Sequence, residues 1–168
     1  MKVLYRDKEI AFTLVKTRFG EKPLLQYPHA AGILPVEKLK SRKQYLWLVE
    51  QYRLGSGAKS WEIPAGKKKN NESILQCAKR ELAEETGLIA SDYRMILDNI
   101  ALSNSVSDER ATIFVARGLT QAEASPEETE VLQLRRLPLR EAIAMVRRGE
   151  ITDSISVIAL LVLALDDQ

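Results

Sequence analysis

Three glutamates in one short segment constrain this chain more than any other feature of its sequence. The segment GKKKNNESILQCAKRELAEETGL, residues 66–88, has a helical pattern in its second half and carries Glu81, Glu84 and Glu85. In a helix Glu81 and Glu85 lie about 40° apart, and Glu84 lies about 60° to the other side of Glu81. Like charges at these spacings repel by roughly 0.2–0.5 kcal/mol per pair even when they are exposed. A bound cation would compensate for this repulsion.

The same segment predicts where its helix lies. The helix is expected from about residue 71 to residue 86, because Gly87 is a typical C-terminal stop. Its apolar stripe is formed by Leu75, Ala78 and Leu82. The helical wheel places Glu81 and Glu85 beside this stripe, at the edge of the core. Their repulsion is therefore not explained by a solvated helix surface.

The rest of the chain predicts a single mixed domain. Its 168 residues fit one domain. Apolar and alternating segments predict strands at residues 9–19, 29–36, 44–53, 93–102, 110–119 and 131–137. Loops are expected at residues 54–60, 103–109 and 124–130, and further helices at residues 139–150 and 154–165. This order of elements indicates an α/β or α+β fold.

Charge and spacing argue against nucleic acid as a partner. A net charge of +2 is small, and the run of lysines at residues 67–69 is typical of a solvated loop. The segment LGSGAKS, residues 54–60, lacks the spacing of a phosphate-binding loop because Ala58 separates Gly57 from Lys59.

The sequence predicts a cytoplasmic protein without a membrane partner. The first nine residues contain no apolar stretch of the kind found in signal peptides. The apolar run at residues 155–165 is too short to span a bilayer and is expected to be a buried terminal helix. The single cysteine, Cys77, cannot form an internal disulfide and is expected to fill space in the helix.

A turn followed by an acidic helix suits a hard divalent cation. Oxygen ligands of this kind favour Mg²⁺ or Mn²⁺, and Mg²⁺ commonly bridges carboxylates to substrate phosphates. The segment therefore predicts a phosphate-bearing substrate, with Arg53 and Arg80 available to hold phosphate oxygens. A simpler alternative for Arg80 is an ion pair with Glu84, four residues further along the helix.

The segment resembles the signature of the Nudix hydrolases. That signature reads G-x5-E-x7-R-E-U-x-E-E-x-G-U, in which U is an aliphatic residue. Its nine fixed positions are met in this chain by Gly66, Glu72, Arg80, Glu81, Leu82, Glu84, Glu85, Gly87 and Leu88. Nine matches at set spacing indicate a specific resemblance.

Flanking segments are similar to the ADP-ribose pyrophosphatase branch of that family. They are VEQYR with WEIPAGK before the signature and GEITDSISVIALL near the C-terminus. The resemblance implies an α/β/α sandwich with a mixed sheet. It also implies a homodimer in which a short N-terminal β region, residues 1–28, contacts the partner, and residues 29–168 form the Nudix domain.

The resemblance also implies roles for particular residues. The metal ligands would be the Ala65 carbonyl, Glu81 and Glu85, with Glu84 close by as a catalytic residue. The substrate would be contacted by Arg53, Glu62 and Gly66, and the geometry of the loop and helix would be supported by Glu72 and Arg80. Family members hydrolyse a pyrophosphate linkage by attack of water on phosphorus, assisted by metal ions.

Two loops compete to supply the general base. The first offers Glu109, and the second offers Glu127, Glu128 and Glu130. The chain has one histidine, His29, which is expected on a strand in a structural role, so a carboxylate is expected to accept the proton.

The segment that follows the signature bears on which nucleotide is the substrate. Relatives that act on ADP-ribose commonly carry S-P-G after the signature, whereas this chain has Ser103-Asn104-Ser105. The expected substrates are therefore ADP-ribose or another nucleoside diphosphate sugar, such as GDP-mannose. A hydrolase of nucleoside triphosphates and a non-catalytic nucleotide sensor are the remaining alternatives.

Overall fold

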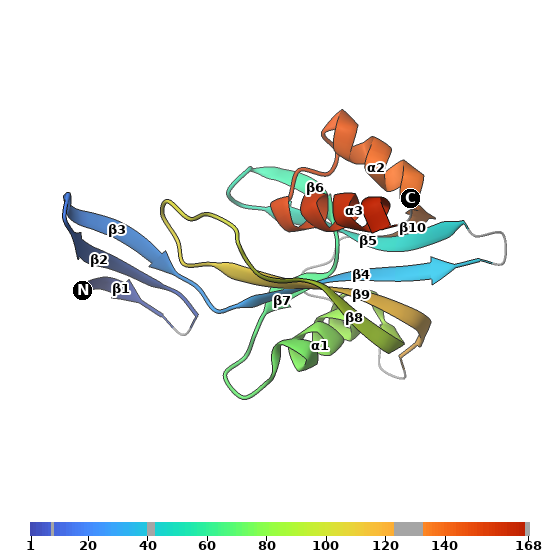
Figure 1. Ribbon diagram of the computed structural model, residues 1–168, viewed down its shortest axis with the longest axis horizontal. Coiled ribbons are helices and arrows are strands. Elements are labelled where there is room, and N and C mark those ends of the chain that lie inside the picture. The colour runs from blue at the N-terminus through green and yellow to red at the C-terminus, as the bar shows by residue number, and fades with distance from the viewer. Residues whose placement is uncertain (8, 40–42, 123–132, 167–168) are drawn as a thin grey trace.

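The computed structural model of this protein describes residues 1–7, 9–39, 43–122 and 133–166 (Figure 1). Within these residues the chain forms ten strands and three helices. In chain order they are β1 (Lys2–Arg6), β2 (Ala11–Thr17), β3 (Gly20–Gln26), β4 (Ala30–Lys38), β5 (Gln44–Arg53), β6 (Ala58–Glu62), β7 (Ala65–Lys67), α1 (Ile74–Thr86), β8 (Leu88–Ala101), β9 (Arg110–Gln121), β10 (Gln133–Pro138), α2 (Leu139–Arg148) and α3 (Ser154–Asp166).

The larger sheet is mixed, as predicted. Its strands run in the order β10-β5-β4-β9-β8, with β6 paired to β5 and β7 paired to β4. The pairing of β4 with β9 is parallel and the other pairings in this sheet are antiparallel. The short strand β7 therefore brings the start of the 66–88 segment against β4 at the centre of the sheet.

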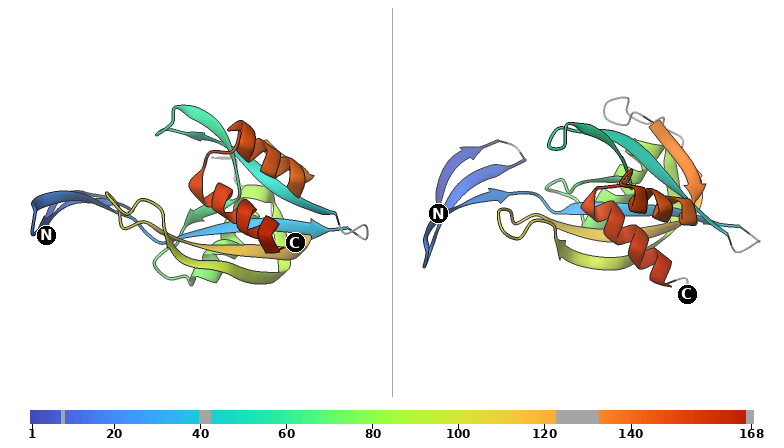
Figure 2. Two further views of the ribbon diagram at one scale, coloured as in Figure 1. Left: turned by 45° about the horizontal axis from the view of Figure 1, so that its top comes forward. Right: turned by 90° about the horizontal axis from the view of Figure 1, so that it is seen from above.

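Helices cover both faces of this sheet, with α1 on one face and α2 and α3 on the other (Figures 1 and 2). Successive side chains of the central strands point to opposite faces of the sheet, so each strand contributes to the core on both sides. On β4, Ile33 packs in the cluster that contains Ala78 and Leu82 of α1, while Leu34 packs in the cluster that contains Leu160 of α3. The predicted α/β/α sandwich is confirmed.

Helix α1 begins later than the sequence suggested. It starts at Ile74, not near residue 71, because Ser73 caps it: the Ser73 hydroxyl accepts from the Gln76 amide and the Gln76 side chain accepts from the Ser73 amide. The prediction that Gly87 ends the helix is confirmed by its left-handed φ of 66°.

One of the three residues predicted for the apolar stripe of α1 was wrong. Leu75 is 37% exposed, whereas Cys77 is fully buried beside Ala78 and Leu82. The sheet packs against the side of the helix that carries Cys77, and Ile74, not Leu75, packs partly buried against the same cluster. The structural role predicted for Cys77 agrees with this position.

Several predicted limits of the strands were wrong, two of them by three residues or more. Residues 54–60 were expected to be a loop, but β6 begins at Ala58 and pairs with the end of β5. Strand β8 begins at Leu88, five residues before the predicted start. Strand β5 has the predicted limits, Gln44–Arg53.

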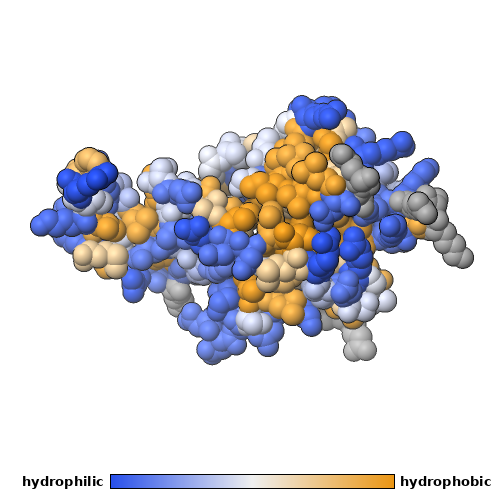
Figure 3. Space-filling model, in the orientation of Figure 1, coloured by the Kyte–Doolittle hydropathy of each residue, from blue (hydrophilic) through white to orange (hydrophobic). Residues whose placement is uncertain are grey.

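The terminal helix α3 is buried on one face only. Its outward residues Ile158, Leu161 and Leu165 are 36%, 45% and 68% exposed. Apolar side chains accordingly gather over α3 on the face shown in Figure 3. No helix in the described part of the chain has both the length and the apolar character needed to cross a lipid bilayer.

Strands β1, β2 and β3 form a separate sheet that projects from one end of the body (Figure 1). The end of β3 is tied to the loop at residues 103–109. The Leu25 amide donates to the Val106 carbonyl at 2.8 Å, and the Tyr27 amide donates to the Asp108 carboxylate at 2.9 Å. The N-terminal sheet therefore helps to hold the loop that carries Glu109.

Candidate active site

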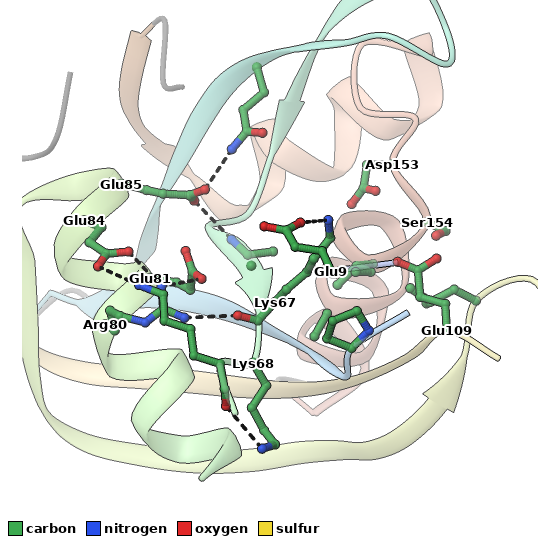
Figure 4. Close-up of a pocket in the computed structure, with 18 of the residues that line it drawn as sticks. Glu9, Lys67, Lys68, Arg80, Glu81, Glu84, Glu85, Glu109, Asp153 and Ser154 are labelled. Carbon is green, nitrogen blue, oxygen red and sulfur yellow. Dashed lines mark hydrogen bonds and ion pairs between the residues drawn. The ribbon is translucent and has the colours of Figure 1, made fainter. Parts of the chain in front are cut away.

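A cavity of about 910 Å³ gathers most of the predicted site residues (Figure 4). Its walls come from the β5 end, β7, the following loop, α1, the loop at residues 102–109 and the start of α3. The predicted residues that line it are Arg53, Ala65, Gly66, Arg80, Glu81, Glu84, Glu85 and Glu109. This volume lies in the range of small-molecule and cofactor sites.

Arg80 is the centre of the charge network on α1. Its Nη1 donates to Glu81 at 2.7 Å and to Glu84 at 2.8 Å. Its Nε and Nη2 donate to Glu72, and Nη2 also donates to the Lys67 carbonyl at 3.1 Å. The predicted ion pair with Glu84 is present, and the same guanidinium holds the pKa of Glu72 down at about 2. Part of the glutamate repulsion is therefore compensated within the chain.

Glu85 is buried and is held by neutral partners. One carboxylate oxygen accepts from the Gln51 amide at 2.9 Å, and the other accepts from the Ala65 backbone amide at 3.1 Å. Burial raises the pKa of Glu85 to about 8, and the nearby charge of Glu81 adds to the rise. The site therefore contains a carboxylate whose negative charge is only partly compensated.

Glu81 lies directly against β7, a short strand where the sequence predicted a turn before the helix. A Cβ atom at Gly66 would overlap the Glu81 carboxylate, so a side chain there would displace that carboxylate from its present position. Burial raises the pKa of Glu81, although the hydrogen bond from Arg80 opposes this rise. The two buried carboxylates, Glu81 and Glu85, thus face the same cavity from one side of α1.

The donors in this cavity suit a hard divalent cation in their chemistry. Three carboxylates and the backbone of Ala65 and Gly66 in β7 line the cavity, and Mg²⁺ and Mn²⁺ prefer such oxygen ligands. Among the described residues, no three acidic, histidine or cysteine side chains are already gathered around one point. Arg80 Nη1 lies between Glu81 and Glu84, so these carboxylates would have to turn from Arg80 toward an ion.

Arg53 reaches the cavity with Glu62 behind it. Its Nε donates to both Glu62 oxygens at 3.0 Å, and its Nη2 donates to one of them. The Arg53 side chain is 47% exposed, whereas that of Glu62 is 2% exposed. Glu62 therefore fixes one edge of the guanidinium and leaves its other edge toward the cavity.

Glu109 lies across the cavity from the glutamates of α1, near Asp153 and Ser154 (Figure 4). Burial raises the pKa of Glu109, and the charge of Lys67 opposes this rise. The other predicted base candidates, Glu127, Glu128 and Glu130, lie outside the described residues.

Sequence reasoning did not assign several charged or polar residues of this cavity, among them Glu9, Gln51, Lys67 and Asp153. A signal for Gln51 was available, because it precedes Arg53 by two positions on β5 and so lies on the same face of the strand. Glu9 gives no such signal, since it belongs to the turn between β1 and β2 and is brought to the cavity by the tertiary fold.

His29 lies one residue before β4, and not on the strand as predicted. Its Nε2 is 2.9 Å from the Thr112 hydroxyl, and that hydroxyl donates to Asp98. The His29 carbonyl accepts from the Lys68 amide at 2.7 Å. The imidazole is thus held by the β9 side chain, and these contacts support the structural role predicted for it.

Comparison with known proteins agrees with this geometry. The NUDIX domain family model matches residues 26–158. The chain is 32% identical to the methanol dehydrogenase activator of Bacillus methanolicus over 150 residues, which cover 88% of this chain and 78% of that protein.

Two relatives are ADP-ribose pyrophosphatases. The protein from Mycobacterium tuberculosis is 36% identical over 118 residues, which are 68% of this chain and 56% of that protein. The protein from Escherichia coli (strain K12) is 29% identical over 174 residues, covering 98% of this chain and 81% of that protein.

The fold is also shared with a solved structure, described as the crystal structure of ADP compounds hydrolase. It superimposes with a TM-score of 0.76 at 21% identity, over 98% of this chain and 89% of that one. The predicted resemblance to the ADP-ribose pyrophosphatase branch is confirmed by these relatives, and the chain belongs to the NUDIX domain family.

Proposed function

We propose that this protein hydrolyses the pyrophosphate bond of ADP-ribose or a related nucleoside diphosphate sugar. The products would be a nucleoside monophosphate and a sugar phosphate. One observation carries the proposal: three glutamates of the family signature and Arg53 line a single cavity large enough for such a substrate. The broader class, a hydrolase acting on pyrophosphate bonds, follows from the family and its relatives.

We expect Mg²⁺ or Mn²⁺ to be the cofactor. The ion would be held by Glu81, Glu85 and the Ala65 carbonyl, with Glu84 close by. When bound, such an ion neutralises charge that develops on the phosphates and makes water more acidic. The raised pKa values of Glu81 and Glu85 support this assignment, because a cation would relieve the cost of their buried charge.

Arg53 would bind the phosphates of the substrate. Its outer edge is free to donate two parallel hydrogen bonds, a geometry that suits phosphate oxygens. Glu62 would act as a positioning residue by holding the inner edge. Gly66 would let the substrate and the turn approach each other, since a side chain there would fill the space beside Glu81.

Glu109 is the described residue best placed to act as general base. It lies across the cavity from the α1 glutamates, where a water between the two walls could approach phosphorus (Figure 4). The water oxygen would attack phosphorus while the bridging P–O bond breaks, and Glu109 would take the proton that water loses. The predictions for Glu127, Glu128 and Glu130 remain open alternatives for the same role.

A substrate panel with Mg²⁺ tests this function. ADP-ribose, GDP-mannose, ADP-glucose, UDP-glucose, a diadenosine polyphosphate and dGTP would be incubated with the enzyme, and the products separated by chromatography. We expect a nucleoside monophosphate and a sugar phosphate from at least one nucleotide sugar, with ADP-ribose as the preferred substrate. Release of pyrophosphate from dGTP alone would contradict the proposal, and silence across the panel would favour a nucleotide sensor.

We expect the protein to form a homodimer. Two surfaces support this prediction: the N-terminal sheet projects from the body, and α3 exposes Ile158, Leu161 and Leu165 (Figures 1 and 3). Exposed apolar surface of this kind is typical of interaction sites. Light scattering coupled to size-exclusion chromatography should give twice the chain mass of 18.9 kDa. A mass equal to one chain at micromolar concentration would contradict the dimer.

The cytoplasmic location and the absence of nucleic-acid and membrane partners stay predictions from the sequence. Nothing in the geometry of the cavity depends on them.

A further inference from the structure

One ion pair joins the N-terminal sheet to the candidate active site. The Lys67 ammonium lies 2.7 Å from the carboxylate of Glu9, and both residues line the cavity. Figure 4 shows the pair between the α1 glutamates and Glu109. The two residues are 58 positions apart in the chain, so tertiary structure alone brings them together.

The backbone of Lys67 is held firmly in the site. It belongs to β7 and is paired with Ala30 of β4, and its carbonyl accepts from Arg80 Nη2. Its ammonium is also 5.9 Å from the centre of the Tyr27 ring. Lys67 therefore presents a positive charge to the cavity from a fixed position beside Gly66.

Glu9 is presented by a structured turn between β1 and β2. The carboxylate of Asp7 accepts hydrogen bonds from the amides of Glu9 and Ile10, both at 2.7 Å. The Asp7 amide donates in turn to the Ile10 carbonyl at 3.0 Å. These bonds hold the backbone of Glu9, and its side chain reaches Lys67.

Stability does not explain the pair. The side chains of Glu9 and Lys67 are 65% and 43% exposed, and ion pairs of this kind contribute little to folding. The other cavity cations have partners in the family signature or on β6. Arg80 bonds three glutamates, and Arg53 is held by Glu62. Lys69 lies 3.9 Å from Glu84, and Lys68 donates to the Glu72 carbonyl at 3.0 Å. Lys67 instead pairs with Glu9, whose carboxylate belongs neither to the family signature nor to β6.

An anion that enters the cavity competes with Glu9 for Lys67. The carboxylate of Glu9 occupies the place beside the ammonium that a phosphate oxygen would take, and it adds negative charge to a cavity already lined by Glu81, Glu84, Glu85, Glu109 and Asp153. Both effects raise the cost of binding an anionic substrate, and the cost grows with the number of phosphate charges.

We propose that Lys67 binds a phosphate of the substrate and that Glu9 competes for it, so that the N-terminal sheet sets the affinity and the charge selectivity of the site. This inference rests on the proposed function. Glu9 acts as a specificity residue: it disfavours triphosphates more strongly than nucleotide sugars, because each added phosphate charge meets its carboxylate.

Three variants test the competition: Glu9→Gln, Lys67→Gln and the double variant. With the best substrate of the panel at low salt, Glu9→Gln should lower KM about two- to fivefold, with a smaller change in kcat. Lys67→Gln should raise KM about tenfold. In that background Glu9→Gln should lower KM less than it does alone, since without the ammonium Glu9 has no cation to withhold and only its own charge still repels the substrate. The gain from Glu9→Gln should be larger for dGTP than for a nucleotide sugar.

The matched control is Glu50→Gln. Glu50 forms an ion pair with Lys59 at 3.0 Å, in which the glutamate side chain is 13% exposed, and neither residue lines the cavity. This variant should leave KM unchanged. Because exposed charges are screened by ions, the effect of Glu9→Gln should largely vanish in about 0.5 M NaCl.

The failure of this inference can be told apart from failure of the proposed function. If nucleotide sugars are hydrolysed but KM is unchanged in both single variants, the function stands and the competition is wrong. If no substrate is hydrolysed, calorimetry with inorganic pyrophosphate in EDTA replaces kinetics. Tighter binding by Glu9→Gln and weaker binding by Lys67→Gln would still support the competition, and equal or absent binding by all four proteins would overturn it.

Discussion

Replacing Glu85 by glutamine should lower kcat at least about a hundredfold without unfolding the protein. The carboxylate is one of the two buried charges that we expect to hold the metal ion, and a neutral amide is a much poorer ligand for Mg²⁺. Glutamine keeps the shape of the side chain and can still accept from the Ala65 amide. Turnover under saturating Mg²⁺ measures the loss, and circular dichroism checks the fold.

The same variant should be more stable than the natural protein when metal is removed by EDTA. The folded state raises the pKa of Glu85 from an ordinary value of 4.5 to about 8, so it binds a proton more tightly than the unfolded chain does. That contribution is fully present below pH 4.5 and is lost as pH rises through 8. At pH 7, below the folded-state pKa, the folded protein keeps Glu85 largely protonated, and this proton uptake costs on the order of 3 kcal/mol, which Glu85→Gln removes.

Glu141→Gln is the control for this experiment. Glu141 is an exposed helical glutamate that pairs with Arg148 on α2, away from the cavity. It should alter neither turnover nor the stability in EDTA. A folded Glu85→Gln protein with normal turnover would remove Glu85 from the catalytic site. A variant less stable than the natural protein in EDTA at pH 8 would contradict the account of its buried charge.

The local parts of the site were predictable because one short segment encodes them. Spacing alone placed Glu81, Glu84 and Glu85 on one face of a helix ended by Gly87, and the structure brings Arg80 among them. Helical periodicity is a property of neighbours in sequence, so it needs no knowledge of the fold. The same holds for β5, whose limits were predicted from its aromatic and branched residues.

Other parts of the site depend on contacts between distant segments. The turn that carries Glu9 meets β7, and β3 ties down the loop that precedes Glu109, through pairings with no sequence pattern. The error at Leu75 has a similar cause, since α1 rotates toward Cys77 to pack against the sheet. Tertiary packing decides which of two adjacent helical faces is buried.

Replacing Arg80 by alanine should destabilise the metal-free protein by about 2 kcal/mol, and lower Tm by roughly 4–8 °C for a chain of this length. The guanidinium joins Glu72, Glu81 and Glu84, and its side chain is only 20% exposed. Its loss leaves three neighbouring carboxylates without their shared partner. Breaking a fully buried pair costs more than this, but partial exposure lets water screen the freed charges.

Mg²⁺ should restore part of the stability lost in Arg80→Ala, because a cation can bind the freed glutamates. This gain in Tm should exceed the gain of the natural protein.

Arg148→Ala is the matched control. Arg148 also joins two glutamates, Glu141 and Glu150, but on the exposed surface of α2, so its loss should change Tm little. Thermal unfolding of the three proteins, in EDTA and in Mg²⁺, measures both effects. Equal Tm losses in the two variants would mean that burial adds nothing to the Arg80 network. If the Tm of Arg80→Ala is the same in EDTA and in Mg²⁺, the freed carboxylates do not form the metal site.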